Sequence, residues 1–463
     1  MIDKIEYKGI WHIPENPENE VEGTLFFNPD GDAILDLIGA FTDFPSSIQN
    51  QKIILGFTTK GKKITLLDCF ENSRSMSFPG INTTSYLVSF IFEGAHFASV
   101  EEIKFNRINA NLSRLEEWVN IWGFDINFDT KVKSIKMNYN IPDSIHFKIN
   151  DSISGYFNFY FKSPMVPAPI FKIEQITDVE LFSENDVDFH DLLELLFHFR
   201  LFLTLGVFED TFIKEIEFSS NALTFHPKED VTYKEKVKLF FVQNSRNTKV
   251  LTRGSHDFLF NFLQIRANFE PILQKFFTLK ETIHPVIDTI FATFSEKDEY
   301  SENRFLNIVQ ALELYHRSII EDTDILKKDF QSILDPILTK LSDQQTKWLR
   351  EKLAYKYEPN LRTRLKFLFR KFPINPLNRI IQSNDLTKII DATVNTRNYY
   401  THYDESLKPK AYKNDKLFYL TEKLKFLLII IVLSETGFTN KEIEDLFSRH
   451  EYRFFNHLIG KSE

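Results

Sequence analysis

The chain has 463 residues, of which 43% are apolar and 26% charged, with only 14 glycines and 17 prolines. This composition excludes a fibrous or disordered chain and, at this length, predicts roughly two to four globular domains. The formal net charge of -9 argues against a protein that coats nucleic acid over its whole surface.

The first half of the chain has the pattern of antiparallel strands. From Tyr7 to about Phe225, apolar and β-branched residues alternate with polar ones in short runs. Asn28-Pro-Asp-Gly31 and Lys60-Gly-Lys-Lys63 each separate two such runs, and Asp-Gly favours the positive φ of a hairpin turn. Further strands are expected at 86–92, 145–149 and 156–161, and helices at 113–122 and 188–205. The product is an antiparallel sandwich or barrel, whose core we expect the 48 phenylalanines to fill.

After about Phe241 the apolar period becomes that of helices. The polar segment 244–249 predicts a linker, with a domain boundary near 240–255. Helices are expected at 256–278, 281–294, 304–319, 327–341, 344–355, 360–371, 385–400 and 415–435. Gly437 is expected to end the last of these, and Thr439-Asn-Lys-Glu442 to open a final helix as a capping box. The predicted fold class is α+β: an acidic β-rich region at 1–240, a helical connector at 241–300 and an all-α bundle at 301–463.

Charge is distributed unevenly between the two ends of the chain. Residues 1–300 carry 29 Lys and Arg against 43 Asp and Glu, a net of -14, whereas residues 301–463 carry 27 against 22, a net of +5. Nine cations and two anions lie between Lys347 and Lys371. This run is either a solvated helical face or a surface for a polyanion such as RNA, with Lys366, Arg370 and Lys371 as candidate phosphate contacts.

Several common sites and locations are disfavoured by the sequence. Cys69 is the only cysteine, so neither an internal disulfide nor a cysteine-ligated metal is expected. The N-terminus lacks a signal-peptide pattern and the longest apolar run, 426–433, is too short to span a bilayer, so we expect a cytoplasmic protein without a membrane segment. Phosphate-loop, dinucleotide-binding, zinc-helix and nucleophile-elbow motifs are missing. His190 and His198 lack an evident third ligand, so we expect packed or surface histidines, no metal and no cofactor.

The remaining chemical candidate is Arg397-Asn-Tyr-Tyr-Thr-His402, at the end of a predicted helix in the basic third of the chain. Asn398 and His402 share a helix face, whereas Arg397 lies about 140° around the axis from His402. A chain of this composition contains about one such Arg–His spacing by chance, so the context carries the argument. The alternative is an ordinary surface pair, with a cationic histidine near the negative end of the helix dipole.

In this context the motif resembles that of the HEPN superfamily of metal-independent ribonucleases, an Arg, a polar residue and a His in a helical bundle. The segment from Phe305 to Arg317 looks like an early bundle helix of that family. The N-terminal region, with Gly9-Ile-Trp-His-Ile-Pro14 and Gly23-Thr-Leu-Phe-Phe27, is similar to the domain joined to HEPN in ApeA-type anti-phage proteins. The resemblance implies an endoribonuclease that leaves a 2′,3′-cyclic phosphate and a 5′-hydroxyl. It also implies abortive infection set off by a phage-derived trigger, tRNA as the expected target, and a homodimer or higher oligomer with a composite site.

The resemblance assigns roles to the residues of the motif. His402 would move the proton, because histidine ordinarily titrates near neutral pH, and Arg397 would bind phosphate oxygens. Asn398 would orient the imidazole or the phosphate. Glu313 either pairs with Arg317 one turn away or lies near the catalytic histidine. Three tyrosines either stack on unpaired bases or pack within the bundle: Tyr399, Tyr400 and Tyr403.

Two other functions remain open from the sequence. The bundle is alternatively a non-catalytic HEPN scaffold that binds RNA or a protein partner, which predicts salt-sensitive RNA binding without cleavage. A third interpretation is a sandwich that binds a carbohydrate or another small ligand and carries a helical appendage. It predicts a ligand effect confined to the N-terminal domain.

Overall fold

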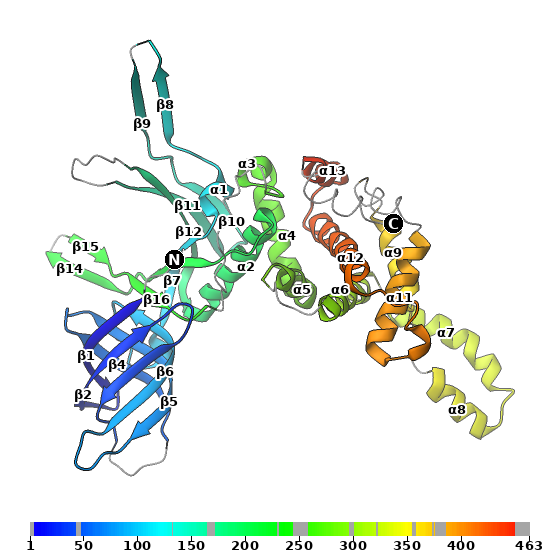
Figure 1. Cartoon of the computed structure of the whole chain (residues 1–463), viewed down its shortest axis with the longest axis horizontal. Coiled ribbons are helices and arrows are strands. Elements are labelled where there is room, and N and C mark those ends of the chain that lie inside the picture. Colours follow the sequence, from blue (N-terminus) through cyan, green and yellow to red (C-terminus); the bar gives the residue numbers. More distant parts are fainter. Residues whose placement is uncertain are drawn as a thin grey trace. The chain divides into compact units, whose positions relative to one another are not determined.

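The structure is a computed structural model that describes residues 4–42, 48–131, 133–163, 172–228, 231–243, 258–295, 301–320, 323–353, 358–372, 375 and 386–449. The chain folds as two compact units, Met1–Glu270 and Pro271–Glu463 (Figure 1). The expected linker at 244–249 lies outside the described residues, so the boundary expected near 240–255 stays a prediction.

The first unit begins with a closed six-stranded antiparallel barrel. Its strands are β1 (Ile5–Ile13), β2 (Asn16–Phe27), β3 (Ala33–Ile38), β4 (Gln51–Thr58), β5 (Lys63–Ser75) and β6 (Thr83–Glu93). They pair in the order β6-β3-β2-β1-β4-β5, and β5 pairs back with β6 from Ile64↔Glu93 to Ser75↔Thr83. Closure leaves no free edge between these strands.

The barrel interior is filled by the alternate, inward-facing side chains of its strands. Trp11 is fully buried at the centre, directly opposite Gly56 on β4. A Cβ atom on Gly56 would lie 2.3 Å from Cε3 of the Trp11 ring, so only glycine leaves room for the indole. The free thiol of Cys69 is also buried in this core, and burial raises its pKa.

Both predicted hairpins of the barrel are present, but one turn differs from its expected geometry. Gly61 adopts φ +75° between β4 and β5, as expected of a glycine in a tight turn. The loop between β2 and β3 instead closes with the Gly31 N–H donating to the Asn28 carbonyl at 3.0 Å, and Gly31 has no positive φ. The expectation for Asp30-Gly31 was wrong because Pro29 fixes a common turn that needs no positive φ.

A second antiparallel sheet continues from the barrel. Its strands are β7 (Lys104–Leu112), β10 (Ile145–Lys148), β11 (Ile153–Lys162), β12 (Glu174–Asp188), β13 (Ile213–Ser219) and β16 (Val237–Phe240). Their order is β10-β11-β12-β7-β13-β16, and β16 pairs with the end of β6, so one strand belongs to both the barrel and the sheet. Two separate hairpins complete the unit: β8 (Phe124–Asp129) with β9 (Ser134–Tyr139), and β14 (Thr224–Lys228) with β15 (Val231–Lys234).

Helix α2 (Phe189–Val207) contacts β7 and β12 of this sheet, and its apolar stripe is buried as the sequence predicted. Trp118 on α1 (Leu115–Val119) lies within 6.4 Å, between ring centroids, of Phe157, Phe199 and Phe202. The phenylalanine enrichment is thus used for packing, as expected. The remaining short helices of the unit are η1 (Val100–Glu102), α3 (Phe262–Ile265) and η3 (Arg266–Asn268).

The second unit is helical. Its helices are α4 (Phe269–Thr282, which starts at the end of the first unit), α5 (His284–Ser295), α6 (Ser301–Tyr315), the π-helical turn η4 (His316–Ile320), α7 (Thr323–Leu338), α8 (Asp343–Leu353), α9 (Leu361–Lys371), α11 (Leu386–His402), η5 (Glu405–Leu407), α12 (Asn414–Glu435) and α13 (Asn440–Arg449). This confirms an α+β fold with a β-rich N-terminal region and a C-terminal bundle.

Helix α12 is the centre of the bundle. Its residues from Leu420 to Leu433 are nearly all buried, and it contacts α5, α6 and α13. It ends as predicted: Gly437 has φ +100°, and the Thr439 and Glu442 side chains accept hydrogen bonds from each other's backbone N–H at 3.2 and 2.7 Å. Over the described part of the chain, no helix combines the length and apolarity that a membrane span requires.

Candidate active site and a polar pocket

The Arg397 to His402 motif forms the last turns of α11. Helix α11 is buried through Ile389, Ile390 and Thr393, and it contacts α6 and α9. Arg397, one turn after Thr393, lies at the edge of this buried face toward α6, whereas Asn398 and His402 lie on the outer side of the helix. Tyr399, within the motif, is buried and belongs to the packing rather than to the surface.

The backbone directly after the motif is held against α11. Tyr403 takes φ +51°, and its N–H donates to the Tyr399 carbonyl at 2.7 Å, which ends the helix. The chain then returns along the helix, because the Tyr412 N–H donates to Thr396 Oγ1 at 3.0 Å and the Tyr400 hydroxyl to the Tyr412 carbonyl at 3.4 Å. The Tyr403 ring is 72% exposed, so it is the one of the three tyrosines best placed to stack on a base.

Arg397, Asn398 and Glu313 come together at this site. Arg397 Nη1 donates to Asn398 Oδ1 at 3.2 Å, and Arg397 Nη2 lies 3.7 Å from Glu313 Oε2 on α6. The side chains of Arg397 and Glu313 are 30% and 25% exposed. Glu313 thus partly neutralises the charge of the guanidinium. The Asn398 amide oxygen and the Glu313 carboxylate together fix the orientation of its two Nη groups.

The alternative pairing of Glu313 with Arg317 is not found. Arg317 Nη2 instead lies 2.8 Å from Glu358 Oε2. The α-helical spacing that would bring the two together ends at Tyr315, where the π-helical turn η4 begins and changes the angle between successive side chains. Glu313 is free of that pair and lies at the Arg397 guanidinium.

His402 is exposed at the end of the motif. It makes no hydrogen bond or ion pair with another described residue. Two hydrogen bonds from Ser406, together with a smaller effect of the nearby His402, lower the pKa of Asp404. The structure therefore brings Arg397, Asn398 and Glu313 together but leaves the histidine outside that cluster, with its imidazole open to an incoming molecule.

The three basic candidates on α9 differ in their surroundings. Lys366 and Arg370 are exposed. Lys371 Nζ lies 3.5 Å from Glu435 Oε1, which also accepts a hydrogen bond from the Tyr315 hydroxyl at 2.5 Å. Lys371 thus has a role in packing α9 against its neighbours, whereas Lys366 and Arg370 present their charges to solvent.

Within the described ranges, no group of three or more His, Cys, Asp or Glu side chains is arranged to hold a metal ion. His190 Nδ1 lies 2.8 Å from Asp188 Oδ1, and His198 Nε2 lies 3.6 Å from Glu194 Oε1. His190 therefore lies beside the N-cap carboxylate of α2, and His198 lies beside a carboxylate one turn earlier on the same helix.

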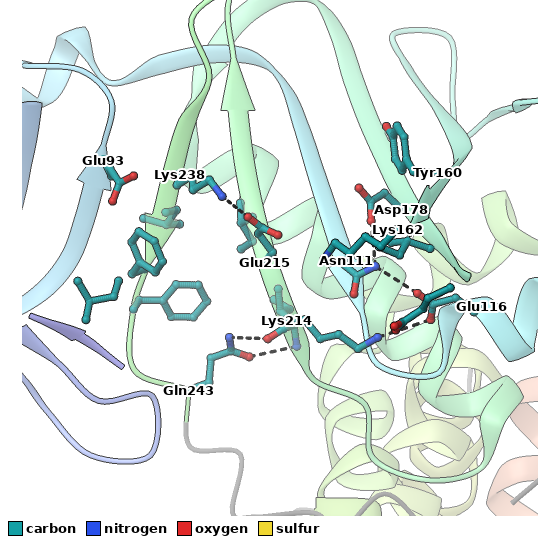
Figure 2. Close-up of a pocket in the computed structure, with 18 of the residues that line it drawn as sticks. Glu93, Asn111, Glu116, Tyr160, Lys162, Asp178, Lys214, Glu215, Lys238 and Gln243 are labelled. Atoms are coloured by element: carbon teal, nitrogen blue, oxygen red, sulfur yellow. Dashed lines mark hydrogen bonds and ion pairs between the residues drawn. The ribbon is translucent and has the colours of Figure 1, made fainter. Parts of the chain in front are cut away.

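A separate polar pocket of about 630 Å³ lies within the first unit, between the barrel and the second sheet. Figure 2 shows Glu93 and Lys238 on one side and Tyr160, Asp178 and Asn111 on the other. These five residues come from five strands, β6, β7, β11, β12 and β16, and lie up to 145 positions apart in the chain. Because no short motif contains them, sequence reasoning missed this pocket.

Most of the charged groups around the pocket are paired with each other. Lys62 Nζ lies 2.7 Å from Glu93 Oε1, and the Tyr7 hydroxyl also donates to Glu93. Burial and this carboxylate raise the pKa of Tyr7, and the hydrogen bond to Glu93 raises the pKa of Lys62. Lys238 pairs with Glu215 in the same way. Lys62 and Glu93 belong to the barrel, and Lys238 and Glu215 belong to the second sheet, so each pair neutralises charge on its own side of the pocket.

Asp178 has a different environment within the pocket. Its two carboxylate oxygens accept hydrogen bonds from the amides of Asn109 and Asn111, both at 2.9 Å. Beside it, burial and the charge of Asp178 raise the pKa of Tyr160, whose ring is 45% exposed. Lys214, 3.5 Å from Glu116, forms the opposite end of this row of side chains.

Residues 6–276, more than half of the chain, match the family described as ApeA N-terminal domain 1, and residues 306–442 match the Apea-like HEPN domain. No curated protein and no solved structure matches the chain. The second match contains both Glu313 and the whole Arg397 to His402 motif. Together with the β-rich unit, the helical bundle and the polar motif on α11, the two matches show that the chain belongs to the ApeA-type HEPN family of anti-phage proteins.

Proposed function

We propose that the protein is an endoribonuclease that cleaves RNA at the Arg397 to His402 motif during anti-phage defence. The observation that carries the proposal is the cluster on α11. An arginine directed by an amide and a carboxylate lies at the end of the same helix as an open imidazole. This pairing of a fixed cation with a proton-transfer group suits phosphodiester cleavage.

The reaction needs no nucleophile from the protein, because RNA supplies its own 2′-hydroxyl. The 2′-oxygen attacks the adjacent phosphorus and loses its proton to a base, while the 5′-oxygen leaves and takes a proton from an acid. The products are a 2′,3′-cyclic phosphate and a 5′-hydroxyl. His402 serves in proton transfer, and Arg397 stabilises the additional negative charge on the phosphorane oxygens. No metal takes part in this scheme.

One motif supplies one histidine, whereas the reaction uses a base and an acid. We therefore propose a homodimer in which two copies of α11 face one cleft, so that His402 of one copy and His402 of the other perform the two proton transfers. Asn398 keeps the guanidinium of Arg397 directed toward the phosphate through the 3.2 Å hydrogen bond. We expect the enzyme to act in the cytoplasm on tRNA, whose loss stops translation.

The test is cleavage of purified tRNA, in EDTA, by the wild-type protein and by the Arg397→Ala and His402→Ala variants. Lys410→Ala, which changes an exposed cation beyond the motif, is the matched control. Cleavage that Lys410→Ala retains and both motif variants lose supports the proposal, and mapping the fragment ends identifies the chemistry. Cleavage that survives both motif substitutions assigns the activity to another site and contradicts it.

A non-catalytic scaffold is the second candidate function, and one observation favours it. Arg397 is partly neutralised by Glu313, and His402 makes no hydrogen bond or ion pair with another described residue. A scaffold predicts that RNA binds in a salt-dependent manner and remains intact, even after infection. The release of fragments with cyclic phosphate ends from infected cells would exclude it.

We also propose that the acidic N-terminal unit regulates the bundle in response to a phage-derived trigger. The motivation is the charge contrast of -14 for residues 1–300 against +5 for residues 301–463. The test follows RNA integrity in cells that carry the wild-type chain or His402→Ala, before and after phage infection. Cleavage confined to infected wild-type cells supports regulation. Equal cleavage before and after infection contradicts it.

A further inference from the structure

The β8–β9 hairpin separates its apolar and polar side chains completely. Residues directly opposite each other on paired strands point to the same face. The pairs on one face are Phe124↔Tyr139, Ile126↔Met137 and Phe128↔Ile135, and those on the other are Asp125↔Asn138, Asn127↔Lys136 and Asp129↔Ser134. One face is therefore entirely uncharged and largely apolar, and the other entirely polar.

Among the described residues, Phe161 contacts Tyr139 at the base of the apolar face, and nothing covers its outer part. Figure 1 shows the hairpin reaching away from the rest of its unit. Ile126, Phe128, Ile135 and Met137 are 44%, 70%, 68% and 49% exposed. A two-stranded hairpin is only marginally stable in water without packing against one face, so this arrangement calls for a permanent cover.

The exposed area is large enough for a protein interface. With about 200 Å² for each fully exposed side chain, the four residues present about 450 Å², which is within the range of the largest apolar patch on a typical monomer. Trp122 and Ile141, 48% and 52% exposed, adjoin the base of the hairpin. They bring the area to about 650 Å² per copy, or about 1,300 Å² for two copies, which is within the range of specific interfaces.

We propose that this face binds the same face of a second copy of the chain. The face carries no charge that would select a different partner, and a flat apolar surface is complementary to itself about a two-fold axis. A second copy is present wherever the chain is, so it covers the face permanently, whereas an infrequent partner would leave it exposed. Lys131 and Lys133 flank the turn and would repel each other in a parallel pair. The two hairpins therefore pack antiparallel, with the Ile126–Met137 pairs near the axis.

The single cysteine of the chain makes a direct test practical, because Cys69 is buried and will not react. In the full-length protein, Met137→Cys places a thiol at the proposed axis, and Asn138→Cys places one on the polar face one residue away. Both variants are treated with a short bis-maleimide at several protein concentrations. We expect a covalent dimer from Met137→Cys that increases with concentration, and at least tenfold less from Asn138→Cys.

Equal cross-linking of the two variants, or no dimer from Met137→Cys at any concentration, overturns the proposal. The rate at which a monofunctional maleimide labels Met137→Cys identifies what is there instead. Rapid labelling at all concentrations means an open face that awaits a foreign partner, and slow labelling at all concentrations means cover by the chain itself. The inference does not rest on the nuclease proposal, since no outcome depends on RNA cleavage.

Discussion

The ion pair between Arg397 and Glu313 leads to a quantitative prediction about RNA binding. Glu313→Gln keeps the shape of the side chain and removes its charge. In the variant, Arg397 does not have to give up an ion pair with a carboxylate before it contacts an RNA phosphate, so RNA is expected to bind more tightly. At 3.7 Å two unit charges attract by about 1 kcal/mol in water and about 4 kcal/mol at an effective dielectric of about 20. Because the two side chains are 30% and 25% exposed, the lower value applies, as it does for exposed pairs in general.

An effect of about 1 kcal/mol corresponds to roughly fivefold tighter binding. The assay is fluorescence anisotropy with labelled tRNA in a His402→Ala background, which prevents cleavage during the titration. The added phosphate contact steepens the dependence of log K on log salt by at most about one, so the gain is largest at low ionic strength. Glu422→Gln is the matched control, because it changes the total charge equally but releases Arg304, 3.0 Å away, instead of Arg397.

Three outcomes of this assay are informative. Tighter binding in Glu313→Gln alone supports a phosphate contact at Arg397. Equal tightening in Glu422→Gln would show that net charge, not Arg397, controls the affinity. Weaker binding in Glu313→Gln would refute the reasoning, because Glu313 would then be required to position the guanidinium.

Three further predictions concern the fold and the basic surface. Burial lowers the pKa of Lys425 from 10.5 to about 8, so its charged form destabilises the folded state by up to about 3 kcal/mol below pH 8. Lys425→Met therefore raises the melting temperature at pH 7, and its advantage disappears as the pH rises from 8 to above 10.5, where the wild-type lysine is neutral in both states. Gly56→Ala lowers the free energy of unfolding, measured with urea, by about 1–3 kcal/mol, because the added Cβ would clash with the Trp11 ring. A variant as stable as the wild type would contradict this and show that the barrel accommodates the extra methyl group. Lys371→Ala lowers stability by about 0.5–1 kcal/mol through loss of its pair with Glu435, whereas Lys366→Ala leaves thermal unfolding unchanged and weakens tRNA binding; the reverse pattern would contradict their assignment.

Turns, helix faces and helix caps were predictable from the sequence because each is determined by residues that are close together in the chain. Gly61 in the turn after β4, the apolar stripe of α2 and the Thr439–Glu442 cap each depend on residues a few positions apart. The closure of the barrel was not predictable in the same way. It depends on β5 pairing with β6 in one register while β6 also pairs with β3 and β16, and no short pattern encodes that choice.

The candidate site shows the same division. The Arg397 to His402 motif lies within one helix, so its position at the end of α11 followed from periodicity. The partner of Arg397 did not, because Glu313 reaches it only through the packing of α6 against α11. The α-helical spacing even favoured the wrong partner for Glu313, namely Arg317, because the sequence contains no pattern that predicts the π-helical turn after Tyr315.

At the candidate site the backbone is held in place, whereas the side chains of Arg397 and His402 do not contact each other. Tyr403 ends α11, and Thr396 within the helix binds the returning chain at Tyr412, so the backbone of the motif is held in place. In contrast, Arg397 is engaged by Glu313, and His402 makes no hydrogen bond or ion pair with any other described residue. The proposed cleavage uses two proton-transfer groups, and the described part of the motif supplies one imidazole, so a second group is needed. A second copy of the same helix end provides that group without any new residue type, which is why we expect catalysis to depend on the pairing of two chains.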